Sequence, residues 1–245
     1  NTPVEMIEAE VPIEIVRYGL APDSGGAGEN RGGLGTWLEF KVFSPGTRIT
    51  ARNRDRTRFQ PWGILGGKAG RPSNFIRNPD TPKEEVLGNQ DTLTAEPGDV
   101  IRFYGPGGGG RGNPLDRAAE RVLRDVERGA LSPQAAQADY GVVIGEGAVD
   151  ESATAALRDE MRAGENGGAH FDFGPEREDY ERRWTPEAYD AMGAIMESLP
   201  VHWRFFVKAR IFDAMDASEA GGVDVVQDAF RRIAAEHPQI GAAAE

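Results

Sequence analysis

The sequence predicts an α+β fold in which a β-rich body with glycine-rich loops is followed by a helical C-terminal tail. Within residues 1–110, apolar and polar side chains alternate in several short segments, as in half-buried strands. Beyond Gly112, helix-capping residues and apolar side chains at helical spacing take over. We therefore expect a body over residues 1–163, a glycine-rich linker over 164–174 and an all-helical tail over 175–245.

The expected strands are short. Residues 4–18 alternate, with Val11, Ile13 and Ile15 set against Glu10, Glu14 and Arg17. Residues 36–43 alternate more cleanly, with Trp37, Glu39, Lys41 and Phe43 on one face and Leu38, Phe40 and Val42 on the other. Further strands are expected at residues 47–52, 61–65, 92–94 and 99–104.

The expected helices begin at recognisable capping residues. Asn113 and Pro114 open a helix that runs to Arg128 and ends at Gly129, and Ser132 opens a second. After a strand at residues 140–144, Asp150 caps a third helix that ends near Ala163. In the tail, helices are expected from Thr185, over residues 200–217 and over residues 223–236.

Composition limits the functions that the chain can have. With 39% hydrophobic and 28% charged residues and no apolar run of about 20 residues, we expect a soluble protein that does not enter a membrane. The net charge of −12 argues against nucleic-acid binding. The absence of cysteine excludes thiolate chemistry and suits a cytoplasmic location. The missing initiator Met suggests a processed or separately numbered fragment.

The glycine-rich segment 105–112 joins an expected strand to an expected helix N-terminus. The N–H groups of Gly107, Gly108, Gly109 and Gly110, with the helix end and Arg111, could hold a phosphate or carboxylate. The alternative is that the glycines allow tight packing between strand and helix. The segment lacks the Lys-Ser/Thr ending of a P-loop and the context of a dinucleotide fingerprint.

A second glycine-rich loop covers residues 23–35. Asp23 and Arg31 could orient a substrate there. Alternatively, Asp23 forms an Asx-turn and Arg31 pairs with a neighbouring carboxylate. The basic stretch from Arg48 to Arg58 is interpreted as a solvated surface or a partner contact.

No catalytic residue can be assigned from residue types. His170, His202 and His237 are far apart in sequence and match no metal-binding spacing, so we expect no metal site made from this chain alone. The aromatic segment with Trp203, Phe205, Phe206 and Phe212 is either a buried core stripe or a docking surface for a partner.

Several segments, taken in order, resemble the C-terminal part of the hydantoinase B/oxoprolinase family. They are residues 1–8 (NTPVEMIE), 23–28 (DSGGAG), 31–35 (RGGLG), 61–67 (PWGILGG), 98–100 (GDV), 106–110 (PGGGG) and 140–143 (YGVV). The helical tail matches the family less distinctly. Arg111 and Asn113 depart from the residues that members often carry after the four glycines, which weakens the transfer of ligand contacts to this loop.

The resemblance implies a shared chemistry. A hydantoinase A-type partner, with ATP and Mg bound to it, phosphorylates a carbonyl oxygen of a lactam, imide or ketone. The B-type subunit then completes hydrolysis or, in acetone and acetophenone carboxylases, carboxylation. The family's divalent metal (Zn, Mn or Fe) is implied to be bound by the N-terminal half of the B-type subunit, so this chain is expected to bind no cofactor alone.

Three hypotheses follow. The first is a part of an ATP-dependent complex that hydrolyses a lactam, imide or hydantoin ring, because more of the family's named activities are ring openings; ketone carboxylation is its alternative. The second is a non-catalytic assembly module that holds an ATPase partner and a metal-bearing chain together. The third is an independent sugar- or anion-binding β domain that would be a stable monomer.

Overall fold

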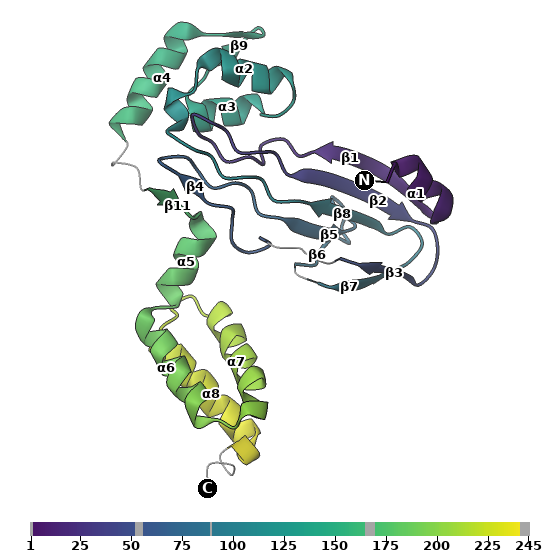
Figure 1. Cartoon of the computed structure of the whole chain (residues 1–245), viewed down its shortest axis with the longest axis vertical. Coiled ribbons are helices and arrows are strands. Elements are labelled where there is room, and N and C mark those ends of the chain that lie inside the picture. The colour runs from purple at the N-terminus through teal and green to yellow at the C-terminus, as the bar shows by residue number, and fades with distance from the viewer. Residues whose placement is uncertain (1, 52–55, 89, 165–169, 241–245) are drawn as a thin grey trace. The chain divides into compact units, whose positions relative to one another are not determined.

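The computed structural model describes residues 2–51, 56–88, 90–164 and 170–240, and Figure 1 shows the arrangement of their helices and strands. The chain divides into two compact units, residues 1–174 and 175–245. The first contains the strands, the α-helices α1 to α4 and the short 3-10 helix η1, and the second is helical. The predicted α+β class, with a β-rich body and a helical C-terminal part, is confirmed.

A five-stranded antiparallel sheet forms the centre of the first unit. Its spatial order is β1 (Ile13–Leu20), β2 (Thr36–Val42), β8 (Val100–Tyr104), β5 (Asn74–Arg77) and β6 (Glu85–Val86). The strands expected at residues 36–43 and 99–104 are confirmed as β2 and β8. Sequence analysis missed β5 and β6, which lie in a segment rich in proline and polar residues.

Three two-stranded ladders accompany this sheet. β3 (Thr47–Thr50) pairs with β7 (Thr92–Ala95), β4 (Gly63–Ile64) with β11 (Phe171–Asp172), and β9 (Ile144–Gly145) with β10 (Ala148–Val149). The expected strands at 47–52, 61–65 and 92–94 correspond to β3, β4 and β7, although residue 52 lies outside the described residues. Of the basic stretch, Arg52 and Arg54 also lie outside them.

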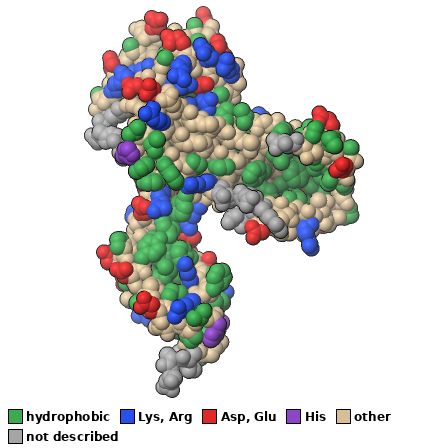
Figure 2. Space-filling model, in the orientation of Figure 1, with side chains coloured by type: hydrophobic (Ala, Val, Ile, Leu, Met, Phe, Trp, Pro, Cys, Tyr) green, Lys and Arg blue, Asp and Glu red, His purple; other side chains and the backbone are tan. Residues whose placement is uncertain are grey.

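One face of the sheet carries a hydrophobic core. Phe75, Ile101 and Leu93 are buried together, and Ile49 from β3 packs against them. The β3–β7 ladder therefore contributes to covering this face. Figure 2 shows hydrophobic side chains gathered over the sheet and charged side chains concentrated over the helical end of the unit.

The expected strand over residues 4–18 is wrong in its first half. Residues Val4–Glu10 form helix α1, and β1 begins only at Ile13. The segment VEMIEAE is rich in good helix formers, whereas the clean alternation is confined to residues 11–15. The side chain of Glu8 accepts a hydrogen bond from the Ile15 N–H at 2.6 Å, which ties α1 to the strand.

Helices gather at the other end of the unit (Figure 1). They are η1 (Pro114–Asp116), α2 (Ala119–Glu127), α3 (Pro133–Tyr140) and α4 (Glu151–Ala163). The capping roles of Ser132 and Asp150 are confirmed, because their side chains accept from Ala135 N and Ala153 N. Val122, Leu131, Ala136, Tyr140 and Val142 form the small core of this end.

Two expectations for this region are wrong. The helix opened by Asn113 is interrupted, because Arg117 has an extended backbone that separates η1 from α2. The strand expected at residues 140–144 is absent over most of its length: Tyr140 ends α3, and Gly141 closes that helix with a φ of 60°. Only Ile144 of that segment lies in a strand.

The expected linker, residues 164–174, is partly described. Residues 165–169 lie outside the described residues. In the part that follows, β11 pairs with β4, and the carboxylate of Asp172 accepts from the Ala69 N–H at 3.1 Å. This end of the segment is therefore fixed to the first unit.

The second unit contains α5 (Pro175–Arg183), α6 (Pro186–Ser198), α7 (Val201–Asp216), α8 (Val223–Glu236) and η2 (Pro238–Ile240). Its core includes the fully buried side chains of Val207, Ile211, Met215 and Val226. Trp203, Phe206 and Phe212 pack against that core, whereas Phe205 is 85% exposed, so the aromatic stripe is mainly a packing surface. Across the described residues, no helix is both long and apolar enough to span a membrane.

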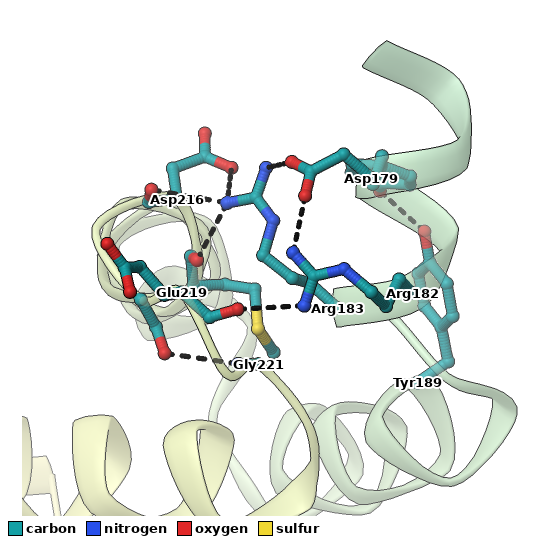
Figure 3. Close-up of polar contacts among 10 residues, drawn as sticks. Asp179, Arg182, Arg183, Tyr189, Asp216, Glu219 and Gly221 are labelled. Carbon is teal, nitrogen blue, oxygen red and sulfur yellow. Dashed lines mark hydrogen bonds and ion pairs between the residues drawn. The ribbon is translucent and has the colours of Figure 1, made fainter. Parts of the chain in front are cut away.

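An ion-pair cluster connects α5 to the end of α7 (Figure 3). Asp179 pairs with Arg182 and Arg183 on its own helix. The Arg183 guanidinium also donates to the carbonyl oxygens of Met215 and Asp216, each at 3.2 Å, in the last turn of α7. A cation at a helix C-terminus satisfies carbonyl groups that have no intrahelical partner.

Candidate functional site

The two glycine-rich loops singled out from the sequence pack directly against each other and against a third segment. We call the segments 24–35, 61–71 and 105–112 the glycine-loop bundle. Backbone hydrogen bonds join all three: Gly26 N donates to Gly108 O at 2.8 Å, Lys68 N to Ala27 O at 2.7 Å and Gly110 N to Lys68 O at 2.9 Å. Segments that are distant in sequence thus form one layer in which backbone packs on backbone.

The bundle requires glycine at its contacts. A Cβ at Gly107 would lie 1.6 Å from the carbonyl oxygen of Ser24, and one at Gly109 would lie 1.8 Å from that of Trp62. A Cβ at Gly32 would lie 1.9 Å from Gly108 O. These distances are far inside van der Waals contact, so the close approach of the chains accounts for the glycines.

The predicted anion-binding N–H groups are largely occupied. Gly107 N donates to Arg71 O, Gly108 N to Gly33 O and Gly110 N to Lys68 O. The Asn113 side chain accepts from Leu115 N at 2.8 Å at the start of η1. These contacts favour the packing interpretation of the glycines, and a role in anion binding would depend chiefly on Arg111.

Arg111 lies at the edge of the glycine-loop bundle with an exposed side chain. Its backbone is fixed by two bonds with Asn30, Arg111 N to Asn30 O at 3.0 Å and Asn30 N to Arg111 O at 2.9 Å. The structure shows no ion pair or hydrogen bond between its guanidinium and any described residue. Arg111 is thus an exposed cation on a fixed backbone, available to bind a ligand or another polypeptide.

Asp23 fixes the start of α3. Its carboxylate accepts from the Ser132 N–H at 2.7 Å, and its own N–H donates to Ala130 O at 3.2 Å. Its φ of 56° lies in the left-handed region, which Asp tolerates better than most residues. The structure thus gives Asp23 a contact with a distant helix start in place of an Asx-turn.

Arg31 belongs to a largely buried ion-pair network. Its Nε lies 3.3 Å from the carboxylate of Asp125. The same carboxylate forms an ion pair with Arg117 at 2.8 Å. Arg117 is only 6% exposed and donates further to Glu29 O at 2.9 Å. The interpretation that Arg31 pairs with a carboxylate is confirmed, but Arg117 and Asp125 carried no local signal that could have identified them.

Tyr140 lies beside this network. The residue is 1% exposed, and its hydroxyl has no hydrogen-bond partner among the described residues. Burial raises the pKa of the phenol to about 12, while Arg117 and Arg31 oppose that shift. The phenol therefore stays protonated near neutral pH.

A second polar cluster contains Lys68 and Asp139. The Lys68 ammonium lies 3.8 Å from the Asp139 carboxylate. Burial raises the pKa of Asp139, Lys68 opposes the shift, and the charge of Asp23 adds to it. A carboxyl group with a raised pKa is a candidate for proton transfer, and sequence analysis did not single out either residue.

The remaining predicted features give no complete catalytic set. His170 belongs to the first unit, whereas His202 and His237 belong to the second. In the described part of the chain, no three or more His, Asp or Glu side chains are grouped so as to hold a metal ion. Among the described residues, the groups considered for chemistry are the Arg111 cation, the protonated phenol of Tyr140 and the Asp139 carboxyl group, whose pKa is raised.

Comparison with known proteins identifies the family. Residues 1–114, which contain the whole glycine-loop bundle, match the family model described as hydantoinase B/oxoprolinase. These residues belong to the hydantoinase B/oxoprolinase family. The resemblance noted in the sequence is confirmed.

The relatives that this chain matches are much longer than the chain itself. It is 40% identical over 144 residues to an uncharacterized protein of Methanocaldococcus jannaschii, covering 59% of this chain and 25% of the relative. It is 39% identical over 165 residues to caprolactamase subunit beta of Pseudomonas jessenii, covering 63% of this chain and 27% of the relative. The chain thus spans about a quarter of these relatives.

One solved structure resembles nearly the whole chain. The nucleotide-free structure of acetone carboxylase aligns with a TM-score of 0.54 at 20% identity, covering 95% of this chain and 33% of that one. At this identity the likeness concerns the fold. It shows that the helical second unit, and not only the family-matched segment, has a counterpart in a known fold.

Proposed function

We propose that this chain is part of an ATP-dependent complex that hydrolyses a lactam, imide or hydantoin ring. In this proposal, a hydantoinase A-type partner with bound ATP and Mg phosphorylates the ring carbonyl oxygen. The observation that carries the proposal is the 39% identity to caprolactamase subunit beta. An amide whose oxygen has become a phosphate ester is far more reactive toward water, provided that donors stabilise the developing charge.

The residues of this chain would support that reaction and not complete it. The glycine-loop bundle would form a rigid wall, Arg111 would present a cation to an anionic intermediate, and Asp139 would be available for proton transfer. We propose that a divalent metal (Zn, Mn or Fe) is held by the region corresponding to the N-terminal half of the B-type subunit, outside these residues.

The decisive assay measures ring opening with companion chains present. The purified chain, the N-terminal region of a B-type subunit and a hydantoinase A-type chain would be combined with ATP, Mg and caprolactam, hydantoin or 5-oxoproline. We expect product only when every chain and ATP are present, with ADP released alongside it. Turnover by the isolated chain without nucleotide would overturn the proposal.

A ketone carboxylase is the second candidate. Similarity to the acetone carboxylase alpha subunit of Xanthobacter autotrophicus, 26% over 205 residues, supports it less strongly. The same mixture supplied with acetone, bicarbonate and ATP distinguishes the two candidates. Carboxylated product without any ring opening would replace the hydrolase proposal by the carboxylase.

A non-catalytic assembly role is supported by the occupied contacts of Asp23 and Arg31. Alanine at either position would disturb α3 or the buried network, so lost activity there would be ambiguous. Arg111→Ala is the cleaner variant, with Arg121→Ala as a matched control on the exposed side of α2. We expect Arg111→Ala to lower turnover about tenfold or more, as loss of one donor to a developing charge does, with the complex intact. Loss of assembly with that variant would favour the module instead.

A further inference from the structure

One face of the central sheet carries arginine and aromatic side chains in adjacent rows. The register places Arg17, Glu39 and Arg102 directly opposite one another across β1, β2 and β8. Trp37 lies opposite Tyr104 in an adjacent row. Because residues two apart on a strand share a face, both rows are on the same side of the sheet. That side is opposite to the one occupied by Phe75 and Ile101.

The aromatic rings on this face are stacked beneath guanidinium groups. The Arg17 guanidinium carbon lies 3.5 Å from the centroid of the Trp37 ring, and that of Arg71 lies 4.8 Å from the Tyr104 ring. The two rings are 4.9 Å apart. We call Arg17, Trp37, Tyr104 and Arg71 the arginine–aromatic face. Stacking holds each guanidinium in place while its N–H edge stays free to donate.

Arg17 and Arg71 differ from Arg102, the third arginine on this side of the sheet, in their ion pairs. Arg102 forms ion pairs with two carboxylates, Glu39 at 2.5 Å and Asp80 at 2.7 Å. For Arg17 and Arg71, the described residues supply no carboxylate partner. Two exposed cations without an ion pair to any described residue are therefore held on one face of a chain whose formal net charge is −12.

The backbone beneath these side chains is well anchored. Arg71 N donates to Ser24 O at 2.8 Å, and Arg71 O accepts from Gly107 N at 3.0 Å, so Arg71 is fixed to the glycine-loop bundle. Arg17 lies in β1, where its backbone is opposite that of Glu39 in the neighbouring strand β2. A surface whose cations are already positioned loses less conformational entropy when it binds.

We propose that the arginine–aromatic face is a docking surface for an acidic protein segment, bound through Asp or Glu carboxylates on Arg17 and Arg71. A guanidinium presents parallel donors that match the two oxygens of a carboxylate. Trp, Tyr and Arg are the residues enriched at binding hot spots. Two arginines are too few to neutralise a run of phosphates, which disfavours a nucleic acid as the occupant. This docking proposal does not depend on which reaction the complex catalyses. It can therefore be contradicted or supported independently of the proposed function.

The test measures binding of a short fluorescent peptide of alternating Glu and Ser, with a Gln and Ser peptide as the uncharged comparison. At low salt we expect the full chain to bind the acidic peptide only, with Arg17→Ala/Arg71→Ala weakening binding about tenfold or more. Arg121→Ala/Arg128→Ala, which removes the same charge from an exposed helical region, should bind like the wild type.

A lysine double variant guards against loss of folding and against a purely nonspecific charge effect. Arg17→Lys/Arg71→Lys retains the charge and loses the planar fork, so we expect binding between those of the wild type and the alanine variant. Three results would each overturn the proposal: no binding by the wild type, equal binding by all variants, or lysine binding that equals the wild type. Circular dichroism of each variant verifies that it is folded.

Discussion

A methyl group added at Gly107 would meet the carbonyl oxygen of Ser24 at 1.6 Å, a contact that no side-chain rotation can relieve. Gly107→Ala should therefore force the backbone of the glycine-loop bundle apart and lower the free energy of unfolding by about 3 kcal/mol or more. Gly33→Ala is the matched control, because a Cβ there meets nothing within 4 Å. Urea unfolding of both variants provides the measurement, and equal stabilities would contradict the packing role of Gly107.

Because of Asp99, we expect the free energy of unfolding to decrease at acid pH. Burial alone would raise the pKa of this carboxyl, but hydrogen bonds from the Arg77 guanidinium, the Glu96 N–H and the Asn78 amide outweigh burial and lower it from 3.8 to about 2. Because the pKa is lower in the folded state, the stabilisation is present above pH 3.8 and is lost as the pH falls toward 2.

Asp99→Asn tests this pH dependence. We expect the variant to be less stable than the wild type near neutral pH, with the difference shrinking as the pH approaches 2. Urea unfolding at a series of pH values measures it. Asp159→Asn is the control, because Asp159 is exposed and makes no ion pair with a described residue. A difference between wild type and Asp99→Asn that stays constant with pH would contradict the lowered pKa.

Among the elements, α7 should depend on a side chain from α5. Arg183 is mostly buried, with 12% of its side chain exposed, and donates to two carbonyl groups in the last turn of α7. Arg183→Ala should lower the stability of the second unit by about 2 kcal/mol, because charge-assisted bonds to helix-end carbonyls are lost. Thermal unfolding followed by circular dichroism would show this loss.

Arg182→Ala supplies the comparison within the same ion-pair cluster. Its side chain is 57% exposed, and its pairing with Asp179 lies at the surface. Its removal should cost about 0.5 kcal/mol, as is usual for exposed ion pairs. If both variants lost the same stability, the contact of Arg183 with the end of α7 would not be the stabilising feature.

Elements whose signals are local could be predicted from the sequence. Ser132, Asp150 and Thr185 each cap a helix within the next three residues, so short sequence patterns located those helices correctly. The β5 and β6 strands depend on pairing with β8, which is distant in sequence, and they were missed. The break at Arg117 arises where that side chain enters a network with Asp125 and Glu29, which no local pattern reveals.

In the candidate site too, local features could be predicted from the sequence, whereas contacts between distant segments could not. The glycine loops were visible as composition, but their mutual packing became apparent only through contacts between segments more than thirty residues apart, such as Gly26 with Gly108. Arg31 could be suspected as one member of an ion pair. Its partner Asp125 is 94 residues away and could not be identified without the fold.

At the scale of the whole molecule, the second unit should fold by itself. Its core, from Trp184 to Ile240, consists entirely of residues within 175–245. We expect a fragment of residues 175–245 to be helical and to unfold cooperatively, because it buries its own apolar faces. Circular dichroism and thermal melting of the fragment test this. A fragment without helical signal would show that the unit needs the first one to fold.

The backbone-on-backbone contacts of Gly32, Gly107 and Gly109 also limit how this protein can change over time. When two side chains meet in a core, an enlargement on one side can be tolerated after a reduction on the other. Here each glycine faces a carbonyl oxygen, and there is no smaller group to substitute on either side. In a mutagenesis screen, defects at these positions should lack second-site suppressors within the loops, and reversion should be the prevailing route to recovery.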